Sequence, residues 1–227
     1  MIAALVLLVA VAAPIAICAE DLNGIAGTYA VGQFRKNYSG SVNVSVPYQA
    51  TNASWYTNWI MFVAPVGATP LQPMVQVGIM RWLDHGRQPS AFISYQQVGK
   101  ALVYKDLGPI ADGEHALRIW GNDRTIHLAV DDKIVASYPR AQFFRPNDHT
   151  YFQYSAEVKQ AGDHIVGYLR DPRVKGDDDA AEHPIGVPCI RSDRGLDLTE
   201  TADHRFDANG AFTPEVRSAF RGPCKSP

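Results

Sequence analysis

The chain is poor in the features that identify most enzyme and binding classes. Its 227 residues include only three cysteines, 19% are charged, and Lys+Arg (21) nearly balances Asp+Glu (23). Without a basic excess, a nucleic-acid-binding protein is not expected. No apolar run of spanning length follows the N-terminal segment, which excludes a multi-spanning membrane protein. P-loop, HExxH, CxxC, GxSxG and Rossmann glycine patterns are also absent, so we expect no cofactor and no metal.

The N-terminal segment predicts export. Residues 1–19 are almost wholly apolar, Pro14 interrupts them, and the small residue Ala19 precedes Glu20. This pattern is typical of a secretory signal peptide cleaved near Ala19. We therefore expect a secreted, periplasmic or cell-surface protein with no membrane segment after cleavage. An uncleaved N-terminal anchor is the alternative, because about 18 apolar residues are just enough to span a bilayer.

Export also determines how the cysteines are interpreted. If Cys18 leaves with the signal, Cys189 and Cys224 remain. Two cysteines in an exported protein usually pair, so we expect a disulfide that closes the C-terminal tail. Asn-x-Ser sequons begin at Asn37, Asn43 and Asn52. They act as glycosylation acceptors only in a eukaryotic secretory pathway.

Between about residues 41 and 166, short apolar segments alternate with turn residues. The expected strands are 42–46, 59–64, 74–82, 90–98, 101–104, 115–120, 125–130, 133–138 and 151–158. Many short strands with little helical periodicity predict an all-β protein, an antiparallel β-sandwich. Asp131-Asp132 lies between two alternating segments and predicts a tight hairpin turn.

These patterns divide the chain into a signal peptide (1–19), an N-terminal leader (20–40), a β-sandwich domain (41–170) and an irregular, disulfide-stapled C-terminal tail (171–227). The tail has frequent prolines and glycines, and a helix is predicted over 213–220. Its acidic run, residues 177–179 with Glu182, offers oxygens of the kind Ca²⁺ takes. A solvated loop is the simpler interpretation of such a charge run.

Two of the expected strands carry polar residues on one face. In the strand expected over 74–82, period two puts Gln76 and Gly78 on the same side. In the strand expected over 151–158, Gln153, Ser155 and Glu157 share a side. A glycine inside a strand indicates close approach by a ligand or another backbone. If both sides belong to one sheet face, Gln76 and Glu157 could meet over a groove.

The same strands resemble those of glutamic peptidases of the eqolisin and neprosin-like kinds, which are secreted concanavalin-like jelly rolls. The segment Val75-Gln76-Val77-Gly78 looks like the strand of their first catalytic position, and Trp59 is placed like an upstream tryptophan of the eqolisins. Ser155-Ala156-Glu157-Val158 is similar to the strand of the second neprosin glutamate. Glu157 follows Gln76 by 81 residues, which is compatible with the eqolisin order.

This resemblance implies acid-active hydrolysis of peptide bonds. Glu157 would be the general acid/base and Gln76 the oxyanion donor. The implied substrate groove consists of Trp59, Gly78, Tyr95, Gln153 and Ser155.

A non-catalytic carbohydrate-binding or polysaccharide-active module is the alternative on the same fold. Concanavalin-like sandwiches bind sugars with aromatic rings and amides. The residues that could supply these groups are Trp55, Tyr56, Trp59, Trp82, Tyr95, Gln96, Gln97, Tyr151, Gln153 and Tyr154. The expected partner is thus a polypeptide or a glycan. The peptidase requires the Gln76 and Glu157 side chains to converge within about one water's reach on a concave face, and it fails if they point to opposite sheets. An exposed row of aromatic rings along that groove would favour the sugar binder.

Overall fold

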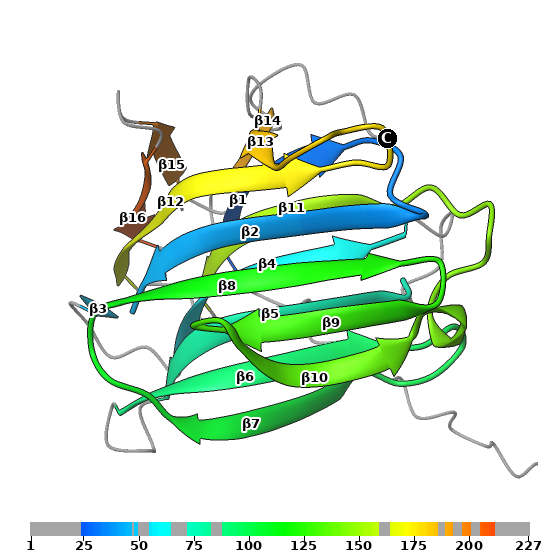
Figure 1. Ribbon diagram of the computed structural model, residues 1–227. Coiled ribbons are helices and arrows are strands. Elements are labelled where there is room, and N and C mark those ends of the chain that lie inside the picture. Colours follow the sequence, from blue (N-terminus) through cyan, green and yellow to red (C-terminus); the bar gives the residue numbers. More distant parts are fainter. Residues whose placement is uncertain are drawn as a thin grey trace, which may run out of the picture.

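The computed structural model describes residues 24–46, 48–49, 55–64, 72–82, 88–158, 164–185, 189–192, 197–200 and 205–211. The strands form two antiparallel sheets that lie one over the other (Figure 1). Within the described residues, helix is limited to one 3-10 turn, η1 (Arg140–Gln142). The predicted all-β sandwich is confirmed.

The first sheet, sheet A, has the strand order β14-β1-β11-β4-β5-β6-β7. Its strands are β1 (Gly24–Val31), β4 (Trp55–Val63), β5 (Met74–Trp82), β6 (Pro89–Gln96), β7 (Val103–Pro109), β11 (Tyr151–Val158) and β14 (Cys189–Ser192).

The second sheet, sheet B, has the order β10-β9-β8-β2-β12-β16-β15, and two short strands, β3 and β13, also pair with β12. Its strands are β2 (Asn37–Ser45), β3 (Tyr48–Gln49), β8 (Glu114–Asn122), β9 (Thr125–Val130), β10 (Lys133–Pro139), β12 (His164–Lys175), β13 (His183–Pro184), β15 (Asp197–Glu200) and β16 (Arg205–Ala211).

The sandwich extends beyond both ends of the segment 41–170 that the sequence assigns to it. β1 lies in the expected leader and pairs with β11 on one side and β14 on the other. β14, β15 and β16 lie in the expected tail and extend both sheets. β1 has the sequence GIAGTYAV, whose glycines and alanines have low strand propensity. Its place in the sheet comes from pairing with distant strands, which local sequence does not reveal.

The hairpin turn at Asp131-Asp132 is confirmed. β9 ends at Val130 and β10 begins at Lys133, and the two loop residues have φ of 49° and 62°. Positive φ at both positions is the signature of a type I′ turn. The Asp131 Oδ1 accepts the backbone N–H of Ala116 at 2.9 Å, so the turn is fastened to the neighbouring strand β8.

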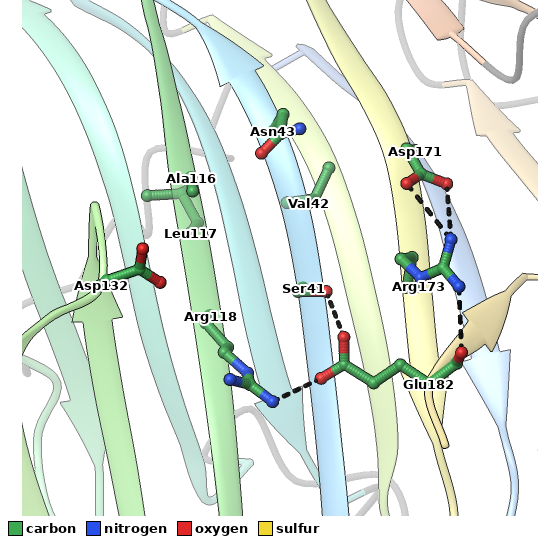
Figure 2. Close-up of a pocket in the computed structure, with 10 residues that line it drawn as sticks. All are labelled: Ser41, Val42, Asn43, Ala116, Leu117, Arg118, Asp132, Asp171, Arg173 and Glu182. Atoms are coloured by element: carbon green, nitrogen blue, oxygen red, sulfur yellow. Dashed lines mark hydrogen bonds and ion pairs between the residues drawn. The ribbon is translucent and has the colours of Figure 1, made fainter.

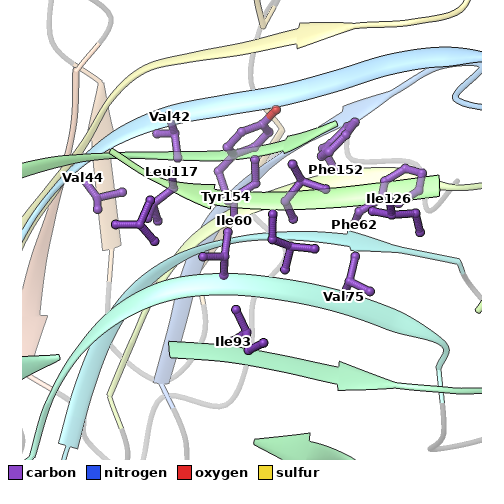
Figure 3. Close-up of a cluster of buried hydrophobic side chains, with 14 of the residues drawn as sticks. Val42, Val44, Ile60, Phe62, Val75, Ile93, Leu117, Ile126, Phe152 and Tyr154 are labelled. Carbon is purple, nitrogen blue, oxygen red and sulfur yellow. The ribbon is translucent and has the colours of Figure 1, made fainter. Parts of the chain in front are cut away.

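The hydrophobic core fills the space between the two sheets (Figure 3). Ile60, Phe62 and Val75 of sheet A are fully buried there. Leu117 and Ile126 of sheet B are fully buried as well. Each such side chain stabilises the fold by roughly 1.5–3 kcal/mol. Because the inner faces are closed by this core, binding surfaces must lie on the outer faces or at the ends of the sandwich.

The acidic run after β12 is used for hydrogen bonding within the fold. Oδ1 of Asp177 accepts the backbone N–H groups of Arg35, Lys36 and Asn37 at 2.8, 2.7 and 3.1 Å. This carboxylate therefore ties the loop after β12 to the turn before β2. In the described part of the chain, no group of three or more His, Cys, Asp or Glu side chains is placed to hold a metal ion.

Several predictions concern residues outside the described ranges. The signal peptide 1–19, Cys224 and the predicted helix 213–220 lie there, so export and the disulfide stay predictions. Cys189 is described and opens β14, opposite Tyr29 of β1. Among the described residues, no helix has the length and apolar character needed to cross a membrane.

Candidate functional site

The outer face of sheet A, which points away from sheet B, carries the polar residues that the sequence singles out. Gln76 lies opposite Met61 and Ser94, and Met61 also lies opposite Gln153. One row across β11, β4, β5 and β6 therefore reads Gln153, Met61, Gln76, Ser94. The three polar members of this row are only 5%, 9% and 3% exposed. Polar side chains that are buried away from the core need hydrogen-bond partners. This row is therefore an ordered part of the structure and not a set of solvated surface residues.

Gln76 leaves one hydrogen-bonding group for a ligand. Its Oε1 accepts the hydroxyl of Ser94. Its Nε2 donates to none of the described residues. An amide nitrogen carries two N–H donors, so Gln76 offers donors to whatever lies over this row.

Glu157 lies on the same face and is half-buried. It stands opposite Thr57 of β4, and its Oε2 accepts the indole Nε1–H of Trp59 at 3.0 Å. Trp59 is two positions further along β4 than Thr57. The carboxylate therefore leans from its own row toward the row of Trp59, which is the direction of Gln76.

The register does not bring Gln76 and Glu157 into contact. Gln76 is level with Met61, and Glu157 is level with Thr57, four positions away on β4. Four positions and two strand spacings separate the two backbones by about 16 Å. Trp59 lies midway on this diagonal, because it faces Gly78 on one side and Ser155 on the other.

Gly78 does allow a close approach, but two side chains of the same sheet take the space. A Cβ at this position would lie 2.5 Å from Cε1 of Phe92 and 2.7 Å from Cβ of Trp59. Trp59 and Phe92 are 3% and 2% exposed and pack with Met80 in a small apolar cluster on the outer face. Phe92 and Trp59 therefore occupy the space above Gly78, and Gly78 does not itself face a ligand.

Tyr95 of β6 lies on the inner face of sheet A, whereas the other predicted groove residues lie on its outer face. Its neighbours Ser94 and Gln96 point outward, so period two turns Tyr95 inward. There it packs against Tyr138 and Phe143, with ring centroids 5.1 and 6.0 Å apart. The prediction that Tyr95 lines the groove does not fit this placement. Gln153 and Ser155 do lie on the outer face, where Nε2 of Gln153 donates to Oγ of Ser155 at 3.1 Å.

Ser94 of this face is missing from the sequence prediction, and Gln96 appears there only as a residue of the sugar-binding alternative. Ser94 and Gln96 are 3% and 7% exposed and lie beside Gln76 and Met74. The same period-two argument that selects Gln76 would have found them, because they alternate with Tyr95. Tyr104 of β7 is 41% exposed and stacks on Phe92, with ring centroids 5.5 Å apart; it lies opposite Ser94.

No protein-family model matches the chain, and no curated protein matches its sequence. Solved structures do match. Scytalido-glutamic peptidase with a transition-state analogue inhibitor is similar at a TM-score of 0.57 and 11% identity, over 83% of this chain and 98% of that chain. SCP-B, a member of the eqolisin family of peptidases crystallised with the tripeptide Ala-Ile-His, is similar at a TM-score of 0.53 and 12% identity, over the same shares.

The fold is therefore that of a glutamic-peptidase-like, concanavalin-like jelly roll, and the resemblance inferred from the short motifs is confirmed at the level of the fold. Polysaccharide-active jelly rolls are also among the matches. Alginate lyase A1-II′ of polysaccharide lyase family 7 has a TM-score of 0.47 over 64% of each chain. A shared fold does not determine chemistry, which has to be argued from the residues of the site.

Proposed function

We propose that this protein is a hydrolase that binds an extended polypeptide on the outer face of sheet A and cleaves it with Gln76 and Glu157. The observation that carries the proposal is the diagonal Gln76–Trp59–Glu157. It offers an amide donor at one end, a carboxylate at the other and, between them, the almost fully buried indole of Trp59. The fold shared with glutamic peptidases supports the same activity.

A peptide group lying over Trp59 would have a different partner on each side. Glu157 would take a proton from a water molecule as its oxygen attacks the carbonyl carbon. The Gln76 side chain would release Ser94 from its Oε1 and turn toward β4, so that its Nε2 donates to the oxygen that becomes negative. Glu157 would then give the proton to the leaving nitrogen as the C–N bond breaks. The products are one carboxylic acid and one amine, and one water is consumed.

The separation of the two groups suits a substrate between them better than direct contact. Two groups in contact would leave no room for a peptide carbonyl and a water. Here the carboxylate already leans toward Trp59, and its bond to the indole nitrogen holds it at 3.0 Å. Only the Gln76 side chain has to change its hydrogen bond.

The test is proteolysis of a denatured protein by the purified protein, from about pH 3 to pH 7. We expect cleavage in acid and a loss of about 100-fold or more in Glu157→Gln and in Gln76→Ala. Glu114→Gln is the matched control, because Glu114 is paired with Arg170 on sheet B and lies outside the groove. No cleavage at any pH, or equal activity in Glu157→Gln, would refute the proposal.

A glycan-binding groove on the same face is the second candidate, and Tyr104 favours it. Its ring is 41% exposed, as a platform for a sugar ring would have to be. Trp59 and Phe92, however, are almost fully buried. If proteolysis fails, titration with oligosaccharides by calorimetry, compared with Tyr104→Ala, tests this function.

A further inference from the structure

A polar pocket opens on the outer face of sheet B, on the other side of the molecule from the proposed groove. It has a volume of about 250 Å³. Strands β2, β8 and β12, the β9–β10 turn and the loop after β12 surround it (Figure 2). Its floor is made by Ser41, Asn43 and Ala116. Val42 and Leu117 also line it, but these residues are only 2% and 0% exposed, and most of the other lining side chains are charged or polar.

Two arginines at the rim are held in place. Arg118 donates through Nη2 to Oε1 of Glu182 at 2.8 Å, and Ser41 donates to Oε2 at 3.0 Å. Arg173 donates through Nη2 to the backbone carbonyl of Glu182 at 3.0 Å and through Nη1 to the carboxylate of Asp171 at 3.3 Å. Side chains that are already ordered lose little entropy when a ligand binds.

The carboxyl group of Glu182 is ionised at neutral pH. Burial alone would raise its pKa, but hydrogen bonds from Ser39 and Ser41 and the nearby Arg118 guanidinium outweigh burial and lower the pKa below its ordinary value. The carboxylate therefore stays an acceptor at one end of the pocket.

Unusual backbone places two further carboxylates at the rim. Asp132 has a φ of 62° in the β9–β10 turn, and Asp171 has a φ of 48°. Asp171 lies where the register of β12 against β2 shifts, between Arg170 and Arg173. An extra residue at such a bulge re-aims the neighbouring side chains.

Two groups of the pocket are not used by the fold. The carboxylate of Asp132 and the side-chain amide of Asn43 have no hydrogen-bond partner among the described residues. Asn43 is half-buried in the floor, and Asp132 stands at the edge. The pocket thus offers a free acceptor and a free amide, next to arginine donors of fixed orientation.

The charges and the lining restrict the ligand class. Three carboxylates (Asp132, Asp171 and Glu182) face two guanidinium groups, so the formal charge of the rim is −1. A phosphate or carboxylate ligand would meet net repulsion, and a lipid or aromatic ligand would meet a lining made mostly of charged and polar side chains. Hydroxyl groups act as both donors and acceptors, so a neutral polyol matches a mixed set of acids, guanidinium groups and an amide. The volume lies below the range of drug-sized pockets, which suits one small ring.

We propose that this pocket binds a single neutral sugar residue, with Asn43 and Asp132 as its direct hydrogen-bond partners. The site lies on sheet B and is separate from the groove on sheet A. Binding here would attach the protein to a glycan while leaving the groove open.

The test is saturation-transfer NMR and calorimetry on the full chain produced in a bacterial host, where the sequon at Asn43 stays unmodified. The probes are the methyl glycosides of glucose, galactose and N-acetylglucosamine, with methyl glucuronide and n-butylamine for charge. We expect at least one neutral glycoside to bind and glucuronide to bind more weakly. Binding of n-butylamine alone, or of no probe at millimolar concentration, overturns the proposal.

Three variants locate the site. Asp132→Gly keeps the turn, since glycine is preferred at positive φ, and removes the carboxylate; we expect binding about tenfold weaker. Asn43→Ala should weaken it similarly. Asp123→Ala, a turn carboxylate outside the pocket, is the control and should bind normally. Sugar binding that survives both pocket variants but is lost in Tyr104→Ala belongs to the groove on sheet A and rejects the pocket.

Discussion

Gly78 gives the sharpest test of how the outer face of sheet A is packed. The structure predicts that Gly78→Ala is destabilising, because the new methyl group would meet Cε1 and Cζ of Phe92 at 2.5 and 2.6 Å and Cβ of Trp59 at 2.7 Å. The ring of Phe92 can shift, but the Cβ of Trp59 is fixed by the backbone of β4. Overpacking of this kind costs about 1–3 kcal/mol. Replacing glycine by alanine in a strand returns about 0.5–1 kcal/mol.

The expected net loss is about 1–2 kcal/mol, which lowers Tm by about 2–8 °C in a chain of this size. Thermal melts followed by circular dichroism measure it. A double-mutant cycle with Phe92→Leu isolates the clash, because leucine lacks the ring atoms that the methyl group meets. The double variant should be more stable than the sum of the single effects predicts, by about 0.5 kcal/mol or more. An unchanged Tm in Gly78→Ala, or strict additivity in the cycle, would refute this account of the packing.

Two further predictions concern sheet B and its loops. His115 contacts Oδ2 of Asp131 at 2.6 Å and the carbonyl of Ala111 at 3.0 Å; burial lowers its pKa, but these acceptors outweigh burial and raise it above its ordinary value. The stabilising contribution of His115 is therefore complete below about pH 6.5 and is lost as pH rises through the folded pKa. Urea unfolding from about pH 5 to pH 9 should show this loss in the native chain and not in His115→Gln; the same slope in both would contradict it. Asp177→Ala should lose about 2–3 kcal/mol, because three backbone N–H groups lose their charged acceptor. Asp178→Ala, next to it and exposed, should lose almost nothing in the same urea titration, and equal losses would show that Oδ1 of Asp177 is not the cause.

The sequence predicted those parts of the fold that local pattern determines. Period two and turn residues gave β5, β9 and β11 with their bounds as observed, and the Asp131-Asp132 turn with its positive φ. β1 was not predicted, because its place in the sheet depends on pairing with β11 and β14, which lie more than 100 residues away in sequence. A strand rich in glycine and alanine shows no local sign of such pairing.

The site shows the same limit at the level of single residues. Alternation placed Gln76, Gln153, Ser155 and Glu157 on one face, and the structure agrees. Alternation cannot give the register between strands, and it is register that puts Gln153, not Glu157, level with Gln76. Each four-residue motif lies on a single strand, so it carries no information about the four-position offset between Gln76 and Glu157 across β4.

Hydrogen bonding on the outer face of sheet A gives the strongest physical reason to look for a ligand there. A buried polar group without a partner costs about 1–3 kcal/mol, so a face that buries hydroxyls and amides has to pair them. Gln153 is paired with Ser155, and Ser94 is paired with Gln76. The amide nitrogen of Gln76 is left with no partner among the described residues, and it points from the middle of the row. Oγ of Ser90, which lies opposite Met80 on the same face, is also buried without a partner among the described residues. The unused donor of Gln76 suits an acceptor supplied from outside, and a peptide carbonyl is the commonest acceptor that an extended chain can bring.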